Sequence, residues 1–209
     1  MESSLRCAAG DARLIETLLW DGRAFPRLPL HLARLAHGAQ ALGFACDLPR
    51  VTDALSRAVD SPTPTPRRTR LTLGAAGDIE VTTAALPPAK PLWRIALAPA
   101  RLSSSDPWLR VKSTRRATYD AARAALPDGL DEVIFLNERD EVCDGTITTL
   151  FFDQGSGLRT PPLSAGLLPG VLRAELAAPE APLMATDLPH VRLWVGNALR
   201  GLIPATFVT

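Results

Sequence analysis

The chain has 209 residues, of which 46% are hydrophobic and 22% charged, and its formal net charge is +1. This composition is ordinary for a globular protein, and arginines interleaved with acids at near-neutral charge exclude a nucleic-acid footprint. No stretch approaches the roughly 18 to 20 continuous apolar residues of a membrane span, so we expect no membrane partner.

Cysteine and histidine are too sparse to suggest a metal site or a disulfide framework. The three cysteines, Cys7, Cys46 and Cys143, are scattered and form no CxxC pair. The three histidines do not form a metal-ligand motif, so we expect no metal. The first ten residues lack the apolar core of a signal peptide. These features together predict a cytoplasmic, reducing location.

The first half of the chain mixes strand and helix patterns. Alternating apolar residues favour strands, and apolar residues at i, i+3 and i+4 favour helices. A glycine at position 43 is expected to end the first helix, and Thr52 or Asp53 to lie near the start of the second. The predicted elements are a strand at 13–20, a turn at 21–22 leading into a strand at 23–25, helices at 30–42 and 51–60, a loop at 61–66, a hairpin at 68–86 and a strand at 93–100.

The second half is richer in strands and loops. The sequence Pro127-Asp128-Gly129 should stop a helix, and a long segment rich in glycine and proline follows the central strands. The predicted elements are a helix at about 114–126, a β-meander at 131–153, a loop at 155–170, a short helix starting after Gly170 and closing strands within 193–209.

A polar segment divides these two halves. Residues 101–107, RLSSSDP, have the composition of an interdomain linker. The sequence therefore predicts an N-terminal α+β domain at 1–100 and a β-rich C-terminal domain at 108–209, in the α+β class.

Lysine is rare in this chain. Only two of the 23 basic residues are lysines, Lys90 and Lys112. Lys90 lies between prolines, whereas Lys112 follows an apolar run and is close to three arginines. Burial and neighbouring cations both favour the neutral amine, which is the nucleophilic form. Lys112 is therefore a candidate for covalent bonding to a carbonyl, and a solvated lysine at a helix start is the alternative.

Two further features suit the binding of charged groups. In LLPGVLR, a glycine before a helix start leaves the backbone N–H groups of Val171 and Leu172 directed at an anion such as phosphate. A helix N-terminus packed without a ligand fits this pattern equally well. Asp144, followed by glycine, is either a turn residue or an inward-pointing acid that pairs with a cation.

The order of these features resembles one family. The segments IETLLWDG, LHLARLAHGAQALGF, VKSTRRATYDAARAA, GLDEVIFLNERDEVCDGTITTLFF and TPPLSAGLLPGVLR resemble, in sequence order, the motifs of the class IV aminotransferases. These are pyridoxal 5′-phosphate (PLP) enzymes of fold type IV, and they include branched-chain aminotransferases, D-amino acid aminotransferases and 4-amino-4-deoxychorismate lyases. The segment GNALRGLIPA is similar to the C-terminal segment of the lyases.

This resemblance implies a fold and a set of site residues. The fold would be that of fold-type IV PLP enzymes, with an N-terminal open α/β sandwich and a C-terminal pseudo-barrel. Lys112 would bond covalently to PLP and shuttle protons, and Asp144 would take the place of a family glutamate that hydrogen-bonds the pyridine nitrogen. The remaining implied residues are Arg34, Val171, Leu172, Asn197 and Ala198 for the cofactor phosphate, and Arg116 and Arg200 for the substrate.

The resemblance also implies an activity. The expected reaction is that of a 4-amino-4-deoxychorismate lyase, which converts a small-molecule substrate to p-aminobenzoate and pyruvate for folate. The alternatives are an amino-acid aminotransferase of the branched-chain or D-amino acid type, and a non-catalytic family member that acts as a binding partner. The family precedent implies a homodimer, and association with aminodeoxychorismate synthase is a further expectation.

Overall fold

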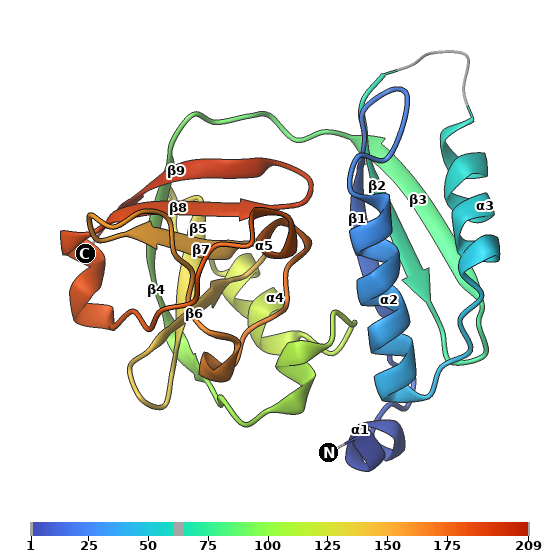
Figure 1. The fold of residues 1–209 in the computed structure, drawn as a ribbon, viewed down its shortest axis with the longest axis horizontal. Coiled ribbons are helices and arrows are strands. Elements are labelled where there is room, and N and C mark those ends of the chain that lie inside the picture. The colour runs from blue at the N-terminus through green and yellow to red at the C-terminus, as the bar shows by residue number, and fades with distance from the viewer. Residues whose placement is uncertain (1, 61–64, 209) are drawn as a thin grey trace. The chain divides into compact units, whose positions relative to one another are not determined.

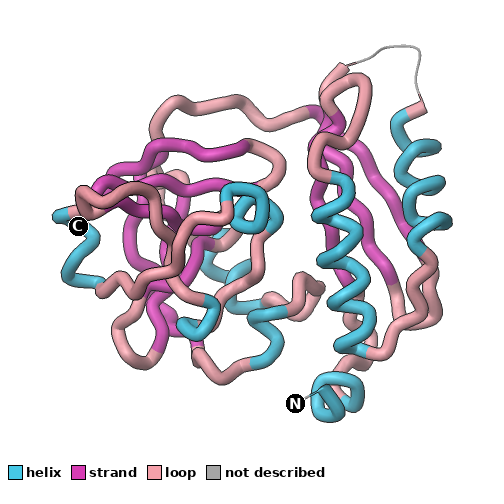
Figure 2. The backbone as a smooth tube through the Cα atoms, in the orientation of Figure 1, coloured by secondary structure: helices cyan, strands magenta, loops and turns pink. Residues whose placement is uncertain are grey.

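The computed structural model describes residues 2–60 and 65–208. The chain divides into two compact units, residues 1–88 with 111–115, and residues 89–110 with 116–209. Each unit contains its own sheet and helices, so the fold is α+β as predicted (Figure 1, Figure 2). Most of the predicted loop at 61–66 lies outside the described residues.

The first unit contains a three-stranded antiparallel sheet in the order β1-β2-β3. Two of its helices, α2 and α3, pack against this sheet, α2 on β1 and α3 on β3 and β2 (Figure 1). Buried leucines of β1 and β2 supply the core between the layers. The elements of this unit are α1 (Glu2–Cys7), β1 (Leu14–Trp20), α2 (Leu28–Leu42), α3 (Leu48–Val59), β2 (Arg67–Leu73) and β3 (Ile79–Ala85).

Both helices of this sheet layer have identifiable ends. Gly43 ends α2 with a φ of 72°, a left-handed conformation that suits glycine, as the sequence predicted. Helix α3 begins earlier than predicted, because the Asp47 side chain accepts a hydrogen bond from the Arg50 N–H and caps the helix there. The predicted caps Thr52 and Asp53 lie inside α3.

The predicted hairpin after β1 is wrong, although its turn forms. The Asp21 carboxylate accepts hydrogen bonds from the N–H groups of Arg23 and Ala24. No strand follows at 23–25, and β1 pairs with β2 instead. The Asx-type contacts explain why a turn signal at Asp21 does not require a strand partner.

The second unit contains a six-stranded sheet in the order β6-β5-β4-β9-β8-β7. Strand β4 runs parallel to β5 and β9, and the other pairs are antiparallel. The edge strands β6 and β7 are consecutive in the chain and approach each other, so the sheet is almost a closed barrel. The strands are β4 (Trp93–Leu102), β5 (Glu132–Asn137), β6 (Val142–Gly145), β7 (Thr149–Asp153), β8 (Arg192–Asn197) and β9 (Gly201–Phe207).

This sheet corrects the predicted meander at 131–153. β5 and β6 pair as predicted, but β7 lies at the opposite edge and pairs with β8. The nearly closed sheet agrees with the predicted pseudo-barrel. The helices of this unit are η1 (Pro107–Arg110), α4 (Ala117–Ala124), η2 (Leu163–Ala165), α5 (Val171–Leu176) and η3 (Ala185–His190), where η denotes a 3-10 helix.

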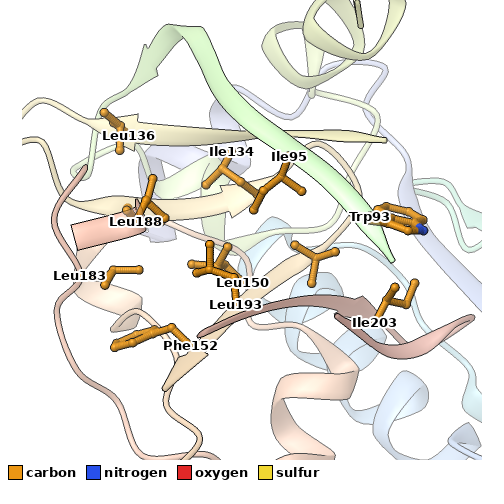
Figure 3. Packing of buried hydrophobic residues seen from close by; sticks show 12 residues of the cluster. Trp93, Ile95, Ile134, Leu136, Leu150, Phe152, Leu183, Leu188, Leu193 and Ile203 are labelled. Atoms are coloured by element: carbon orange, nitrogen blue, oxygen red, sulfur yellow. The ribbon is translucent and has the colours of Figure 1, made fainter. Parts of the chain in front are cut away.

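The interior of the six-stranded sheet is a dense apolar core. Ile95 and Ile134, from the adjacent strands β4 and β5, lie in one cluster with Leu150 and Leu193 from β7 and β8 (Figure 3). Both isoleucines and Leu150 are 0% exposed. The inside of this sheet is therefore filled with apolar side chains.

The division into units differs from the predicted boundary at residue 100. β4 continues through residue 102 and pairs with β5 and β9, so residues 93–102 belong to the second sheet. The predicted linker at 101–107 also lies within the second unit. An interdomain linker and the end of a strand with its following turn can have the same polar composition, so composition alone did not distinguish them. Among the described residues, no helix is both long and apolar enough to cross a membrane.

Candidate active site

Lys112 lies in a short segment that extends the first sheet at the edge of β1. Its carbonyl oxygen accepts a hydrogen bond from the Ile15 N–H at 2.8 Å. Val111 and Ser113 are buried, whereas Lys112 is half-buried. Val111 approaches α2, since a Cβ on Gly38 of that helix would lie 3.8 Å from the Val111 Cγ1. The amine is thus carried by hydrogen-bonded backbone rather than by an exposed loop.

Arg34 belongs to a buried ionic cluster with Glu16 and His31. Its Nε and Nη2 donate to the two oxygens of Glu16 at 2.9 and 2.6 Å. The His31 Nδ1 lies 2.6 Å from the same carboxylate, which is 3% exposed. Burial alone would raise the pKa of Glu16, but Arg34 and His31 lower it to about 2. The bidentate pairing fixes the Arg34 guanidinium plane.

Sequence reasoning missed Glu16 and His31 as partners of Arg34. His31 and Arg34 are three residues apart on one face of α2, which was a usable signal. The carboxylate comes from β1, and no spacing rule connects that strand to the helix. Glu16 is therefore found only from the fold.

Asp144 ends in a buried carboxylate that two different elements hold. It is 5% exposed on β6. The Tyr119 hydroxyl donates to its Oδ1 and the Leu168 N–H donates to its Oδ2, each at 3.2 Å. Burial raises the pKa of the Tyr119 phenol above its usual range, and the Asp144 charge raises it further. Asp144 is therefore a buried acid held by two neutral donors, the Tyr119 hydroxyl and the Leu168 N–H.

Glu132 anchors the 145–148 loop, which comprises the last residue of β6 and the three residues that connect it to β7. This side chain is 0% exposed. It accepts hydrogen bonds from the hydroxyls of Thr146 and Thr148, at 2.5 and 3.0 Å, and from the Ile147 N–H at 3.1 Å. A Cβ on Gly145 would lie 2.5 Å from the Thr148 hydroxyl, so glycine is required there. The loop is consequently held in one conformation by a single buried carboxylate.

Two predicted site residues bind the same loop through its carbonyl groups. The Arg116 Nη2 donates to the Thr146 oxygen at 2.8 Å, and its Nε donates to Asp120 at 2.7 Å. The Asn197 Nδ2 donates to the Ile147 oxygen at 3.1 Å. The loop therefore connects Asp144 with the start of α4 and with the turn after β8.

The start of α5 packs closely on β8. A Cβ on Gly196 would lie 2.5 Å from the Leu172 Cδ2, which places that leucine directly on the strand beside Asn197. Gly170 precedes the helix, and no side chain caps the helix start. A Cβ on Gly170 would lie 2.6 Å from a threonine hydroxyl of β7. The first amides of a helix have no intrahelical acceptor, so those of Val171 and Leu172 suit an anion.

The turn between β8 and β9 carries the last predicted residues. The Asn197 Oδ1 accepts hydrogen bonds from the N–H groups of Leu199 and Arg200, at 3.1 and 3.0 Å. Ala198 is buried within this turn. The Arg200 guanidinium lies over the Trp93 ring, 5.3 Å from its centroid. The turn is thus held from within by the Asn197 side chain and from outside by the contact of Arg200 with Trp93.

The predicted residues separate into two groups by unit. Lys112 and Arg34 belong to the first unit. Each is hydrogen-bonded to β1, the Lys112 carbonyl oxygen to Ile15 and the Arg34 guanidinium to Glu16. The others are linked to one another in the second unit through the 145–148 loop, α5 and β8. They are Asp144, Arg116, Val171, Leu172, Asn197, Ala198 and Arg200.

Comparison with known proteins identifies the family. A family model described as amino-transferase class IV matches residues 13–208. The chain belongs to the class IV aminotransferase family, whose fold is associated with PLP. The resemblance noted in the sequence motifs is therefore confirmed.

Three similar proteins illustrate the range of names within this family. A Mesorhizobium loti structure, provisionally named an amino-acid aminotransferase, is 47% identical, with a TM-score of 0.90 and coverage of 95% of this chain and 100% of that chain. A Schizosaccharomyces pombe protein, provisionally named an aminodeoxychorismate lyase, is 29% identical over 79% of this chain and 73% of its own length. A Mycobacterium tuberculosis protein, named a hypothetical aminotransferase and solved in a PLP-bound form, is 24% identical, with a TM-score of 0.79 over 97% and 83% of the two chains.

The chemistry of the described residues fits PLP. The Asp144 carboxylate is an acceptor for a protonated pyridine nitrogen. The uncapped start of α5 offers N–H groups to a phosphate. Lys112 supplies a half-buried primary amine for the aldehyde. Within the described part of the chain, no group of three or more His, Cys, Asp or Glu side chains is arranged to hold a metal ion.

Proposed function

We propose that the chain is a PLP-dependent 4-amino-4-deoxychorismate lyase that gives p-aminobenzoate and pyruvate in the folate pathway. The observation that carries the cofactor assignment is the buried Asp144 carboxylate, held by a hydroxyl and an amide at the position where the family resemblance expects the partner of the ring nitrogen. The lyase assignment is supported by the GNALRGLIPA segment and by the lyase name of the Schizosaccharomyces pombe relative.

Each proposed role follows from the chemistry of one side chain. PLP supplies a protonated ring that accepts an electron pair from the substrate. The Lys112 amine would hold the cofactor aldehyde when no substrate is bound and, with substrate bound, would be the general base for the Cα proton. Asp144 would keep the proton on the ring nitrogen. The residues proposed to bind the phosphate are Arg34, the amides of Val171 and Leu172, and the turn at Asn197 and Ala198.

Two arginines are proposed to recognise the carboxylates of the substrate. The Arg200 guanidinium lies over the Trp93 ring in a cation–π contact, and a guanidinium can pair bidentately with a carboxylate. Arg116 already donates to Asp120 and to the 145–148 loop, so its substrate contact would be made from a fixed position. A PLP ring that accepts electrons, together with the cations of Arg116 and Arg200, suits the elimination of pyruvate from a substrate with two carboxylates.

An amino-acid aminotransferase is the second candidate. The 47% identical Mesorhizobium loti protein, matched over its whole length, carries that provisional name. The two reactions share Lys112 and differ in outcome: the lyase expels pyruvate from the substrate, and the transaminase passes the amino group to an acceptor. Product analysis distinguishes them, because a lyase forms p-aminobenzoate and pyruvate without an amino acceptor. A transaminase requires a 2-oxo acid.

The setting of the enzyme is proposed on the same basis. The enzyme would be a cytoplasmic homodimer that acts on a small-molecule substrate and associates with aminodeoxychorismate synthase. Size-exclusion chromatography with light scattering measures the dimer directly. Co-elution with the purified synthase tests the association.

The cofactor assignment is tested by covalent trapping. Purified protein mixed with PLP should show a near-visible absorbance band, and borohydride reduction should leave a pyridoxyl group on the peptide that contains Lys112. The Lys112→Ala variant should lack this adduct, and Lys90→Ala, the matched control, should retain it. A wild-type protein that stays colourless and unlabelled with PLP would instead support a non-catalytic binding partner.

A further inference from the structure

The carboxylate at position 144 is one methylene shorter than the glutamate implied by the family resemblance. An aspartate reaches about 1.5 Å less far than a glutamate, because one carbon–carbon bond is missing. It also has one rotatable bond fewer. A short carboxylate has to be held accurately to serve a partner at a fixed distance, so the groups that orient Asp144 become part of its function.

Both oxygens of Asp144 receive a hydrogen bond from the surrounding protein. The donors come from separate elements, the Tyr119 hydroxyl from α4 and the Leu168 N–H from the loop before α5. One donor on each oxygen fixes the rotation of the carboxylate plane. Each oxygen still keeps acceptor capacity, since an ionised carboxylate has about four lone-pair sites.

The Tyr119 ring is itself held in place. It packs edge-to-face on Phe135 with ring centroids 5.0 Å apart. The Arg116 guanidinium lies over the ring, 5.6 Å from its centroid. Packing of the half-buried Tyr119 ring against Phe135 and the Arg116 cation leaves the phenol little freedom to turn away from Asp144.

The hydroxyl is a permanent donor in this setting. Burial and the adjacent Asp144 charge raise the pKa of Tyr119 above its usual range, so the phenol keeps its proton at neutral pH. A donor directed at a carboxylate stabilises the charged form of that carboxylate. Tyr119 therefore favours an ionised Asp144 rather than a protonated one.

We propose that Tyr119 is the positioning residue that orients Asp144 and keeps it ionised as the partner of the PLP ring nitrogen. This inference rests on the proposed cofactor function. Tyr119 acts only through Asp144 and is assigned no contact with substrate. Its loss should therefore change the affinity for PLP and the protonation of the bound ring, and leave Lys112 able to form its covalent bond.

The test compares Tyr119→Phe with the wild type and with Thr118→Ala, an exposed hydroxyl on the same helix. The phenylalanine keeps the ring packing and removes only the donor. Because hydrogen bonds to charged groups are among the stronger ones, we expect the PLP dissociation constant from absorbance titration to rise about tenfold. The pH dependence of the bound-cofactor absorbance should also shift, and Thr118→Ala should match the wild type in both measurements.

A double-mutant cycle separates positioning from general damage. In the Asp144→Asn background, adding Tyr119→Phe should change PLP affinity by less than about twofold, since the charge that the hydroxyl serves is gone. An equal effect of Tyr119→Phe in both backgrounds, or wild-type affinity and spectrum in the single variant, would overturn the inference. Thermal unfolding of each variant without PLP reports whether it is folded.

Failure of the proposed function gives a different pattern. A wild-type protein that forms no Lys112 adduct with PLP would overturn both the cofactor assignment and the role of Tyr119. A wild type that forms the adduct normally, with Tyr119→Phe identical to it, would overturn the role of Tyr119 alone.

Discussion

Replacing Glu16 by glutamine should destabilise the first unit strongly. The glutamine keeps the size of the side chain but removes the charge that pairs with Arg34, whose side chain is only 13% exposed. A pKa lowered from 4.5 to about 2 corresponds to a contribution on the order of 3 kcal/mol at neutral pH. Breaking one partner of a buried ion pair typically costs about 3 to 5 kcal/mol, which agrees.

The pH dependence of this contribution has a definite direction. The folded-state pKa of Glu16 lies below its ordinary value, so the stabilisation is complete above pH 4.5 and is lost as the pH falls from there through about 2. The wild-type protein should therefore lose stability in this range more steeply than Glu16→Gln does.

Urea unfolding followed by far-UV circular dichroism measures the effect. The matched control is Glu80→Gln in the same sheet, because Glu80 is 71% exposed and lies 3.5 Å from Arg13. An exposed pair of this kind contributes at most about 1 kcal/mol, so the control should stay close to the wild type. If Glu16→Gln unfolded within about 0.5 kcal/mol of the control, the buried cluster would not carry the stability argued from its geometry.

Glu132→Gln should lower the free energy of unfolding by about 2 to 4 kcal/mol in the same urea assay, because the buried carboxylate holds the 145–148 loop through three hydrogen bonds; a loss under about 0.5 kcal/mol would contradict this. Gly145→Ala should lower the thermal midpoint, since its Cβ would lie 2.8 Å from Glu132, and an unchanged midpoint would show that the loop yields. Maleimide should label the exposed Cys7 well before Cys143, whose thiol is buried and has a raised pKa; equal labelling rates in the native protein would refute this order.

Local patterns predicted those elements whose signals lie within a few residues. β1 lies within the predicted strand at 13–20, and α2 ends at Gly43 because glycine readily adopts the left-handed conformation there. The start of α3 was also readable, since Asp47 is followed by a leucine and then a proline, an arrangement typical of the first helical turn. The prediction placed more weight on the later threonine and aspartate.

Pairings between distant strands could not be predicted in the same way. Consecutive strands pair with each other in most sheets, so β5, β6 and β7 were interpreted as one meander. The pairing of β7 with β8 places Phe151 opposite Trp194, which is 43 positions further along the sequence, and no local signal reports it. The boundary at residue 100 failed for the same reason, because the partner strands of β4 lie far along the chain.

The candidate site shows the same separation between local and distant information. Motif order identified Lys112, Arg34 and Asp144 as candidates, since those motifs are short and contiguous. It did not identify Tyr119 or Glu16, because each meets its partner only after two elements have packed together. Chemistry read from single residues therefore found the candidates, and the fold was needed to find the groups that orient them.

The short connection between the two edges of the six-stranded sheet bears on the order of its assembly. Only residues 146–148 separate β6 from β7, so bringing these two strands together closes a short loop and costs little conformational entropy. By contrast, the β4–β9 pairing joins Trp93 to Ala205, almost the full length of the second unit. The slow step in refolding this unit should therefore be the pairing of β4 with β9, whereas β6 and β7 should come together quickly.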